Sequence, residues 1–151
     1  MRTSQDYAAI WCVNHTLQLS VKDVLNEEVL HVAIQDILVK CRELAKMVRR
    51  SEARKDELKT ACEKSGIPFI LPVLPNNTRW NSTEANVESI MKLTKALQYL
   101  HFNDATEKQV WLLGVPTARE FQAIKAIHQC LQPLKIMTKK WEGDHHSLFL
   151  K

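Results

Sequence analysis

The chain has 151 residues, of which 45% are hydrophobic, and this is enough for one folded domain with a buried core. Charged residues make up 25% of it, and 21 Lys and Arg against 17 Asp and Glu leave a net charge of +4, which excludes a histone-like polycation. Three glycines and five prolines are too few for the many turns of an all-β sandwich. Composition therefore favours an all-α fold.

The N-terminal segment and the cysteines bear on the cellular compartment. Residues 1–15 (MRTSQDYAAIWCVNH) lack the pattern of a secretory signal, and their apolar stretch is too short to span a membrane. The cysteines are sparse, unlike those of a small secreted disulfide protein, and lie at Cys12, Cys41, Cys62 and Cys130. We therefore expect an intracellular protein with no membrane association, whose thiols are reduced and mostly pack as small hydrophobic residues.

Apolar residues at helical spacing predict two helices in the first third of the chain. The first covers residues 7–25, and the second follows Asn26 as its N-cap. The second has a clean core stripe on one face, formed by Leu30, Ile34, Ile37, Cys41, Leu44 and Val48. A mixed-charge stretch, residues 49–64, predicts a solvated helix that is separated from its predecessor at Ser51 and ends at Gly66 in a left-handed conformation.

Prolines interrupt the helical pattern at positions 68, 72 and 75. No helix can pass this spacing, and each residue before a proline is pushed towards extended geometry. The segment is also rich in large apolar side chains. We therefore predict an extended connector over residues 67–78 that is docked on the core.

Three more helices are expected after the connector. One begins at Asn77 or Thr78 and frays near residue 103, and a short one covers residues 110–114. The last begins at residue 116 or 117, is kinked near Cys130 by Pro133, and stops at Gly143.

Cys12 and His15 are the first candidates for chemistry. They lie three residues apart on a predicted helix, so both side chains can reach one metal ion. A structural zinc site needs four ligands, however, and the other cysteines and histidines have no matching pair spacing. We therefore interpret Cys12 and His15 as buried structural residues and predict no metal, no cofactor and no catalytic residue.

The segment from Asn76 to Thr83 is the second candidate, because it places amides, hydroxyls, a guanidinium and an indole at the start of a helix. Helix-terminal N–H groups and Arg79 both favour a phosphate, and Trp80 can stack on an unpaired base. In the alternative interpretation Thr78 only caps the helix, Trp80 fills the core, and Arg79 meets a carboxylate or a helix C-terminus.

Three segments form an ordered set, namely residues 12–21, 78–83 and 131–138. Together they resemble motifs of the hAT superfamily of DNA transposases and their domesticated BED zinc-finger relatives. Residues 12–21 (CVNHTLQLSV) resemble the Cys-x-x-His segment of that family, and residues 78–83 (TRWNST) resemble its Thr-Arg-Trp-Asn-Ser-Thr segment. Residues 131–138 (LQPLKIMT) are similar to its Leu-x-Pro-Phe-x-x-x-Thr stretch. The resemblance covers nearly the whole chain.

This resemblance implies that residues 1–151 form a single partial domain, the helical insertion of an RNase H-like transposase domain. The family's two catalytic aspartates would precede it and the glutamate would follow it. On the same layout, the BED zinc finger and the dimerisation segment of the family are expected to lie outside residues 1–151. Arg79 and Trp80 inherit a role in handling DNA, and Cys12 and His15 belong to a family motif. Position 84 departs from the family pattern, and Glu84 is expected to repel phosphate.

The resulting hypothesis is a transposon-derived nuclear protein fragment, catalytically incomplete, that binds DNA through Arg79 and Trp80. The alternative is a helical protein-interaction module that has lost nucleic-acid binding. In that alternative, an apolar surface left by the truncation receives a protein partner.

Overall fold

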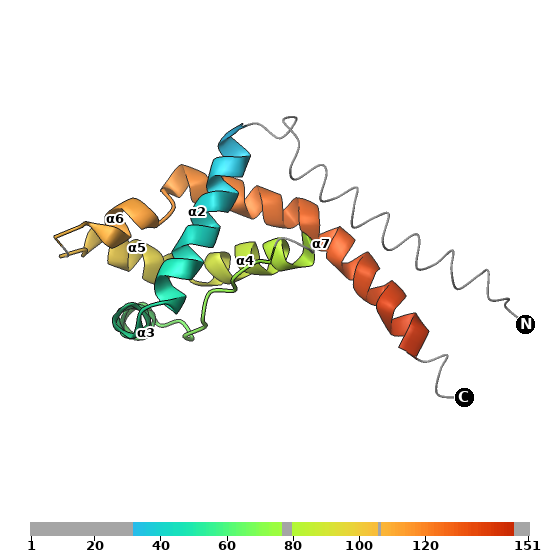
Figure 1. Ribbon diagram of the computed structural model, residues 1–151, viewed down its shortest axis with the longest axis horizontal. Coiled ribbons are helices and arrows are strands. Elements are labelled where there is room, and N and C mark those ends of the chain that lie inside the picture. Colours follow the sequence, from blue (N-terminus) through green and yellow to red (C-terminus); the bar gives the residue numbers. More distant parts are fainter. Residues whose placement is uncertain (1–31, 77–79, 106, 147–151) are drawn as a thin grey trace, which may run out of the picture.

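The computed structural model describes residues 32–76, 80–105 and 107–146, without the side chains of residues 33, 80 and 141–146. Within these ranges it contains six helices and no strand, which confirms the all-α prediction. The helices are α2 (Val32–Arg49), α3 (Glu52–Ser65), α4 (Trp80–Lys92), α5 (Thr94–Phe102), α6 (Val110–Gly114) and α7 (Ala118–His146) (Figure 1). The predicted helix over residues 7–25 and the cap at Asn26 lie outside the described residues.

The core stripe predicted for α2 is confirmed from Ile37 onward, whereas Ile34 is only partly buried and Leu30 lies outside the described residues. Four of its members are at most 7% exposed, namely Ile37, Cys41, Leu44 and Val48. They pack in one apolar core with α3 to α7, which contribute Leu58, Ala61, Cys62, Val87, Ile90, Leu93, Ala96, Leu97, Trp111, Val115, Phe121 and Ile124. None of the helices in the described ranges combines the length and the apolar character needed to cross a membrane.

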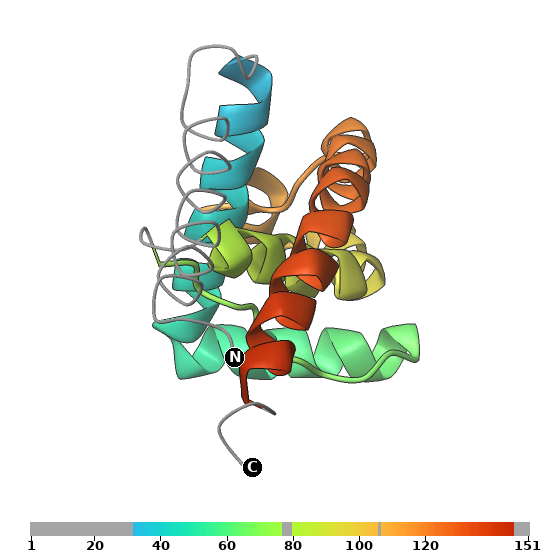
Figure 2. The same ribbon diagram turned by 90° about the vertical axis from the view of Figure 1, so that its right-hand side faces the viewer.

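The turn between α2 and α3 forms as the sequence predicts. Ser51 is the N-cap of α3, and its hydroxyl accepts a bond from the Arg54 N–H at 3.4 Å. Gly66 ends α3 with φ at 66°, in the left-handed region. Figure 2 shows α3 crossing the end of α2, and this places Leu58, Ala61 and Cys62 in the core. The helix is therefore less solvated than we expected.

Residues 67–76 are extended and connect α3 to the approach of α4. Ile67, Ile70 and Leu71 pack against the core, as predicted. Phe69 and Leu74 remain 40% and 43% exposed, so the docking of this segment covers only part of its apolar side chains.

The helix predicted from residue 77 to about 103 is wrong in one respect, since it is broken at Leu93 into α4 and α5. The Thr94 hydroxyl donates to the Met91 carbonyl at 2.7 Å, and such local bonds from Thr compete with the helical ladder. The Leu93 side chain is fully buried at the break. The change of direction lets α5 pack on α3 instead of continuing along α4.

The predictions for α6 and for the start of α7 are confirmed, whereas the end of α7 differs. Thr117 and Glu120 form a capping box: the Thr117 N–H donates to the Glu120 carboxylate at 2.6 Å, and the Glu120 N–H to the Thr117 hydroxyl at 3.3 Å. Gly143 does not stop the helix, which runs to His146. Among the described glycines, only Gly66 has the positive φ that ends a helix in the left-handed conformation. Pro133 lies inside α7, whose orange and red halves point in different directions (Figure 1).

The left-handed cap at Gly66 predicts a loss of stability on substitution. Gly66→Ala should lower the free energy of unfolding by about 1–2 kcal/mol, because a Cβ disfavours this backbone region. The loss comes from the backbone alone, since the added carbon meets no atom within 4 Å. Gly114→Ala is the matched control, since its new Cβ comes no closer than 3.8 Å to the Met47 sulfur. Urea denaturation measures both. Equal stability of Gly66→Ala and the unsubstituted chain would contradict the backbone assignment.

Candidate functional site at the start of α4

Helix α4 carries an unusual set of polar side chains into the interior. In the described residues four polar or charged side chains are buried, and three of them lie on α4: Glu84, Asn86 and Ser89, at 0%, 1% and 5% exposure. A buried polar group is costly unless it is paired. The partners of these side chains therefore determine what α4 must contact.

Asn86 and Ser89 fasten the connector and α2 to α4. The Asn86 amide donates to the Val73 carbonyl at 2.6 Å and to the Cys41 carbonyl at 3.4 Å. The Ser89 hydroxyl accepts from the Val73 N–H at 3.0 Å. Both backbone groups of Val73 are thus satisfied by α4 side chains, which replace the strand partner that an extended segment otherwise needs.

Ser82 closes the loop that precedes α4. Its hydroxyl donates to the Asn76 carbonyl at 2.8 Å and accepts from the Asn76 N–H at 3.1 Å. These bonds join the two sides of the segment that contains Arg79 and Trp80. The polar side chains at positions 82, 86 and 89 follow the spacing of one helical face, and they hold the connector along its length.

A second face of α4 meets α7 through a carboxylate–lysine cluster, which comprises Glu84, Glu88, Lys92, His128 and Lys135. The Lys135 ammonium lies 2.5 Å from Glu84 Oε2 and 2.7 Å from Glu88 Oε2. His128 Nδ1 lies 3.1 Å from Glu84 Oε1, and Lys92 Nζ lies 2.7 Å from Glu88 Oε1. The Glu84 side chain is fully buried and directed into this cluster.

The cluster changes the expectation for Glu84. A surface glutamate next to Arg79 would repel phosphate, but this carboxylate faces α7 and its charge is countered by the ammonium of Lys135. Glu84 is therefore not the exposed charge that this expectation assumed. The sequence could not show this pairing, because Lys135 and His128 lie some 50 residues further along the chain, in α7. The apolar pattern of α7 does not reveal which helix it packs against.

The cluster also shifts the titration of its members. Bonds from Lys135 and then Lys92 lower the pKa of Glu88 to about 2, from an ordinary value of 4.5. Burial acts to lower the pKa of Lys135, but the contacts with Glu84 and Glu88 outweigh it, so the pKa is raised. Both charged forms are thus stabilised in the folded state.

The structure describes only part of the predicted site. Trp80 is the first residue of α4, but its side chain lies outside the described residues, as do Arg79, Cys12 and His15. Of the remaining cysteines, Cys41 and Cys62 are buried as predicted, whereas Cys130 is exposed. In the described ranges no group of three or more His, Cys, Asp or Glu could hold a metal ion.

The comparison with known protein families decides the relationship. A family model described as the ZBED1 RNase-like helical domain matches residues 10–130. The chain belongs to this family. No curated protein and no solved structure shows significant similarity to it.

Membership in the ZBED1 RNase-like helical domain family confirms the predicted relationship to domesticated hAT-type transposases. The matched residues include Cys12, His15, Arg79 and Trp80 and end at Cys130, within α7. Lys135 therefore lies beyond the match, while its partner Glu84 lies inside it.

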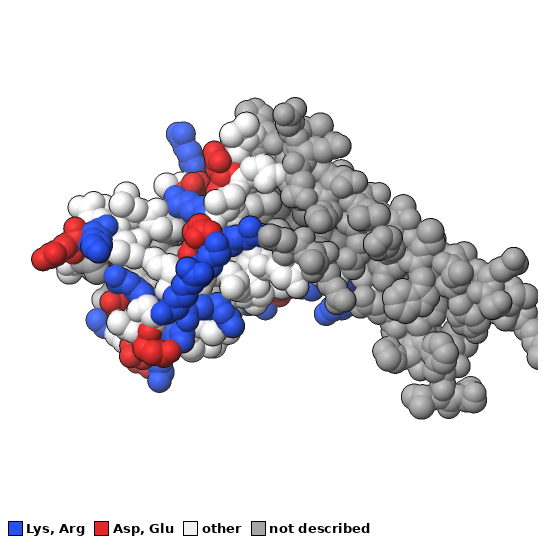
Figure 3. All heavy atoms as spheres, viewed as in Figure 1, with Lys and Arg blue, Asp and Glu red and all other residues white. Residues whose placement is uncertain are grey.

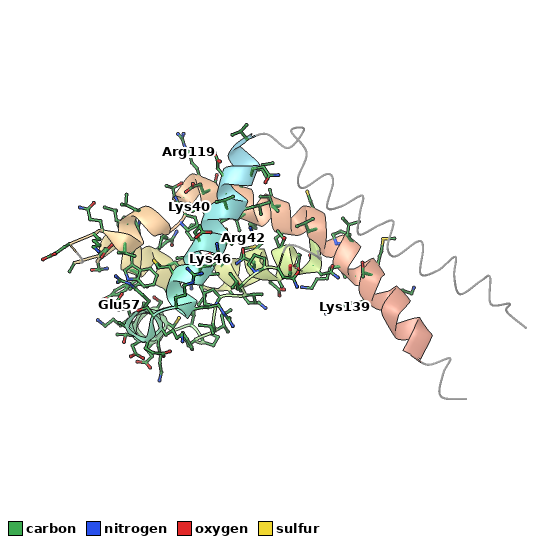
Figure 4. The ribbon with its side chains drawn as sticks, in the orientation of Figure 1. Lys40, Arg42, Lys46, Glu57, Arg119 and Lys139 are labelled. Carbon is green, nitrogen blue, oxygen red and sulfur yellow. The ribbon has the colours of Figure 1, made fainter. Side chains whose placement is uncertain are left out.

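The ion pair between Lys135 and Glu84 predicts a specific cost of substitution. Lys135→Met should lower the free energy of unfolding by about 2–3 kcal/mol, because Glu84 loses its nearest cation. The loss should be somewhat smaller than for a fully buried pair, because the Lys135 side chain is 23% exposed. Lys139→Met, on the exposed part of α7 (Figure 4), is the matched control. Thermal and urea unfolding measure the difference. A Lys135→Met variant no less stable than the control would contradict the pairing.

The lowered pKa of Glu88 predicts a pH dependence. The folded state favours the charged carboxylate, so the stabilisation is complete above pH 4.5 and is lost as the pH falls towards 2. Glu88→Gln should therefore be less stable than the unsubstituted chain near neutral pH, and the difference should shrink on acidification. Urea denaturation from pH 6 to pH 2.5 measures it. Glu107→Gln, which removes an exposed carboxylate, controls for net charge, and a pH-independent Glu88→Gln difference would contradict the assignment.

Proposed function

We propose that the chain is the helical part of a transposase-derived nuclear protein, which binds DNA through Arg79 and Trp80 and does not itself cleave DNA. Family membership supports the transposase origin. The roles of Arg79 and Trp80 come from the resemblance of residues 78–83 to the transposase motif. None of the family's three catalytic carboxylates maps onto a residue of this sequence, so we assign no catalytic residue.

The observation that carries the DNA-binding proposal is the burial of Glu84. Its carboxylate is 0% exposed and lies 2.5 Å from the Lys135 ammonium, so it does not oppose an anion at the start of α4. Arg79 is the only charged residue between Asn76 and Thr83. The bonds between Ser82 and Asn76 anchor both sides of this segment, which reduces the entropy lost when the segment binds a ligand.

A specific observation favours the protein-interaction module as a second candidate. Phe102 and Leu113 are 81% and 70% exposed, and Leu112 is 39% exposed. They belong to α5 and α6, which lie together beyond the C-terminal end of α4 (Figure 1). Large apolar side chains exposed on two helices that pack together are a candidate protein-binding surface.

The DNA proposal predicts salt-dependent binding that requires Arg79. Fluorescence anisotropy with labelled hairpin and single-stranded DNA over a salt series should give an affinity that falls as salt rises. Arg79→Ala should weaken binding and reduce the steepness of the log–log salt dependence by about 1, as for the loss of one phosphate contact. Arg119→Ala removes an exposed arginine from the first turn of α7, beside α2 (Figure 4), and is the matched control.

The same preparation separates the two candidate functions. No binding at low salt, or binding indifferent both to salt and to Arg79→Ala, contradicts the DNA proposal. Light scattering then tests the interaction module. Self-association of the chain that is lost in Phe102→Ser supports this second candidate. A monomer that binds no DNA contradicts both.

A further inference from the structure

Positive charge is concentrated at the corner between α2 and α3. From Lys40 to Lys55 the sequence has seven Lys and Arg and two Asp and Glu. This net charge of +5 exceeds the +4 of the whole chain, so the remaining residues are slightly acidic. We call the basic side chains of residues 40–55 the corner patch.

The corner patch lies on the surface of the second half of α2, the turn at Ser51 and the first turn of α3. None of its basic side chains is buried, and Arg49 and Arg50 are exposed. Figure 3 shows blue side chains forming a band along this part of α2, and Figure 4 places Lys40, Arg42 and Lys46 along the same helix. The basic residues of α2 therefore lie along the surface of its second half, next to the turn at Ser51.

Ion pairing leaves the corner patch positive. Glu120 binds to Lys40 at 2.9 Å and Glu57 binds to Arg54 at 2.7 Å, and both carboxylates come from outside the patch. With these two carboxylates and its own two, seven basic residues stand against four acidic ones, a difference of +3. Arg49 donates to the neutral Pro72 carbonyl at 3.0 Å, so its charge is not cancelled by that contact.

The length and chemistry of the corner patch match a phosphate backbone. Lys40 and Arg50 are ten residues apart, which is about 15 Å along a helix and roughly the axial length of four to five phosphates of one DNA strand. Four of the seven basic residues are arginines, whose planar guanidinium can bind a phosphate with two parallel hydrogen bonds.

The composition of the corner patch argues against a lipid surface. Residues 40–55 are all described, and no large hydrophobic side chain among them is exposed. Membrane-surface helices bury an apolar face in the interface beside their basic residues. The patch therefore offers charge without an insertion surface.

We propose that the corner patch binds the phosphate backbone of nucleic acid without sequence preference. It lies on α2 and α3, whereas Arg79 and Trp80 precede and begin α4. The chain would therefore hold nucleic acid with residues besides Arg79 and Trp80, and the corner patch does not depend on the role proposed for Arg79.

The test uses the full 151-residue chain and labelled 20-base-pair duplexes of two unrelated sequences, with anisotropy measured over a salt series. Lys46→Gln/Arg50→Gln removes two patch charges without entering the core. Lys59→Gln/Lys95→Gln, at exposed sites on α3 and α5, removes the same net charge elsewhere. The patch variant should reduce the log–log salt slope by about 2 and weaken binding on the order of tenfold at 0.1 M salt. The control should stay near the unsubstituted chain, and the two duplexes should bind alike.

Several results would overturn the inference. One is an equal loss of DNA affinity in the patch variant and in the control, while circular dichroism shows that the helix content of both is unchanged. Another is patch-dependent capture by phosphatidylserine vesicles with no binding to either duplex. Arg79→Ala distinguishes the two proposals: if it abolishes binding while the patch variant binds normally, the corner patch fails and the proposed function stands. The opposite result removes the role of Arg79 and supports the corner patch.

Discussion

Glu84 places a carboxylate in the interior, and the rest of the described structure is arranged around the need to compensate it. A buried charge is tolerated only beside an opposite charge and further polar contacts. Lys135 and His128 supply these from α7, at 2.5 and 3.1 Å. This requirement fixes the rotation of both helices about their axes, which apolar packing alone defines much less sharply.

Helix α4 can organise the core because its faces are chemically distinct. One face is apolar and carries Val87 and Ile90 into the core. A second holds the extended connector by hydrogen bonds from Asn86 and Ser89, and a third pairs with α7 through Glu84 and Glu88. The segment resembling the transposase motif thus runs into a helix that contacts α2, α5 and α7, so this motif serves the fold as well as any ligand.

Local signals predicted much of the fold. Helix ends could be predicted at Ser51, Gly66 and Thr117. The Ser51 and Thr117 hydroxyls bond to backbone N–H groups three residues away, and Gly66 has no side chain to oppose the left-handed conformation. The break at Leu93 and the continuation of α7 through Gly143 depend on packing and on neighbours, which a single helical pattern does not reveal. The site was predicted least completely: Arg79 and Trp80 came from a motif, whereas the pairing of Glu84 with Lys135 joins residues far apart in sequence. The polar spacing of Ser82, Asn86 and Ser89 was a readable signal that a purely apolar pattern search passes over.

Pro133 lowers the stiffness of α7 at one point along the helix. It lies two residues before Lys135, and a proline removes one hydrogen bond from the helical ladder, so the helix is least stiff just where it is tied to α4. The red half of α7 extends beyond α4 (Figure 1). That half begins next to Pro133, so the pairing of Lys135 with Glu84 supplies a side-chain tie to α4 close to the point where the backbone ladder of α7 lacks one bond.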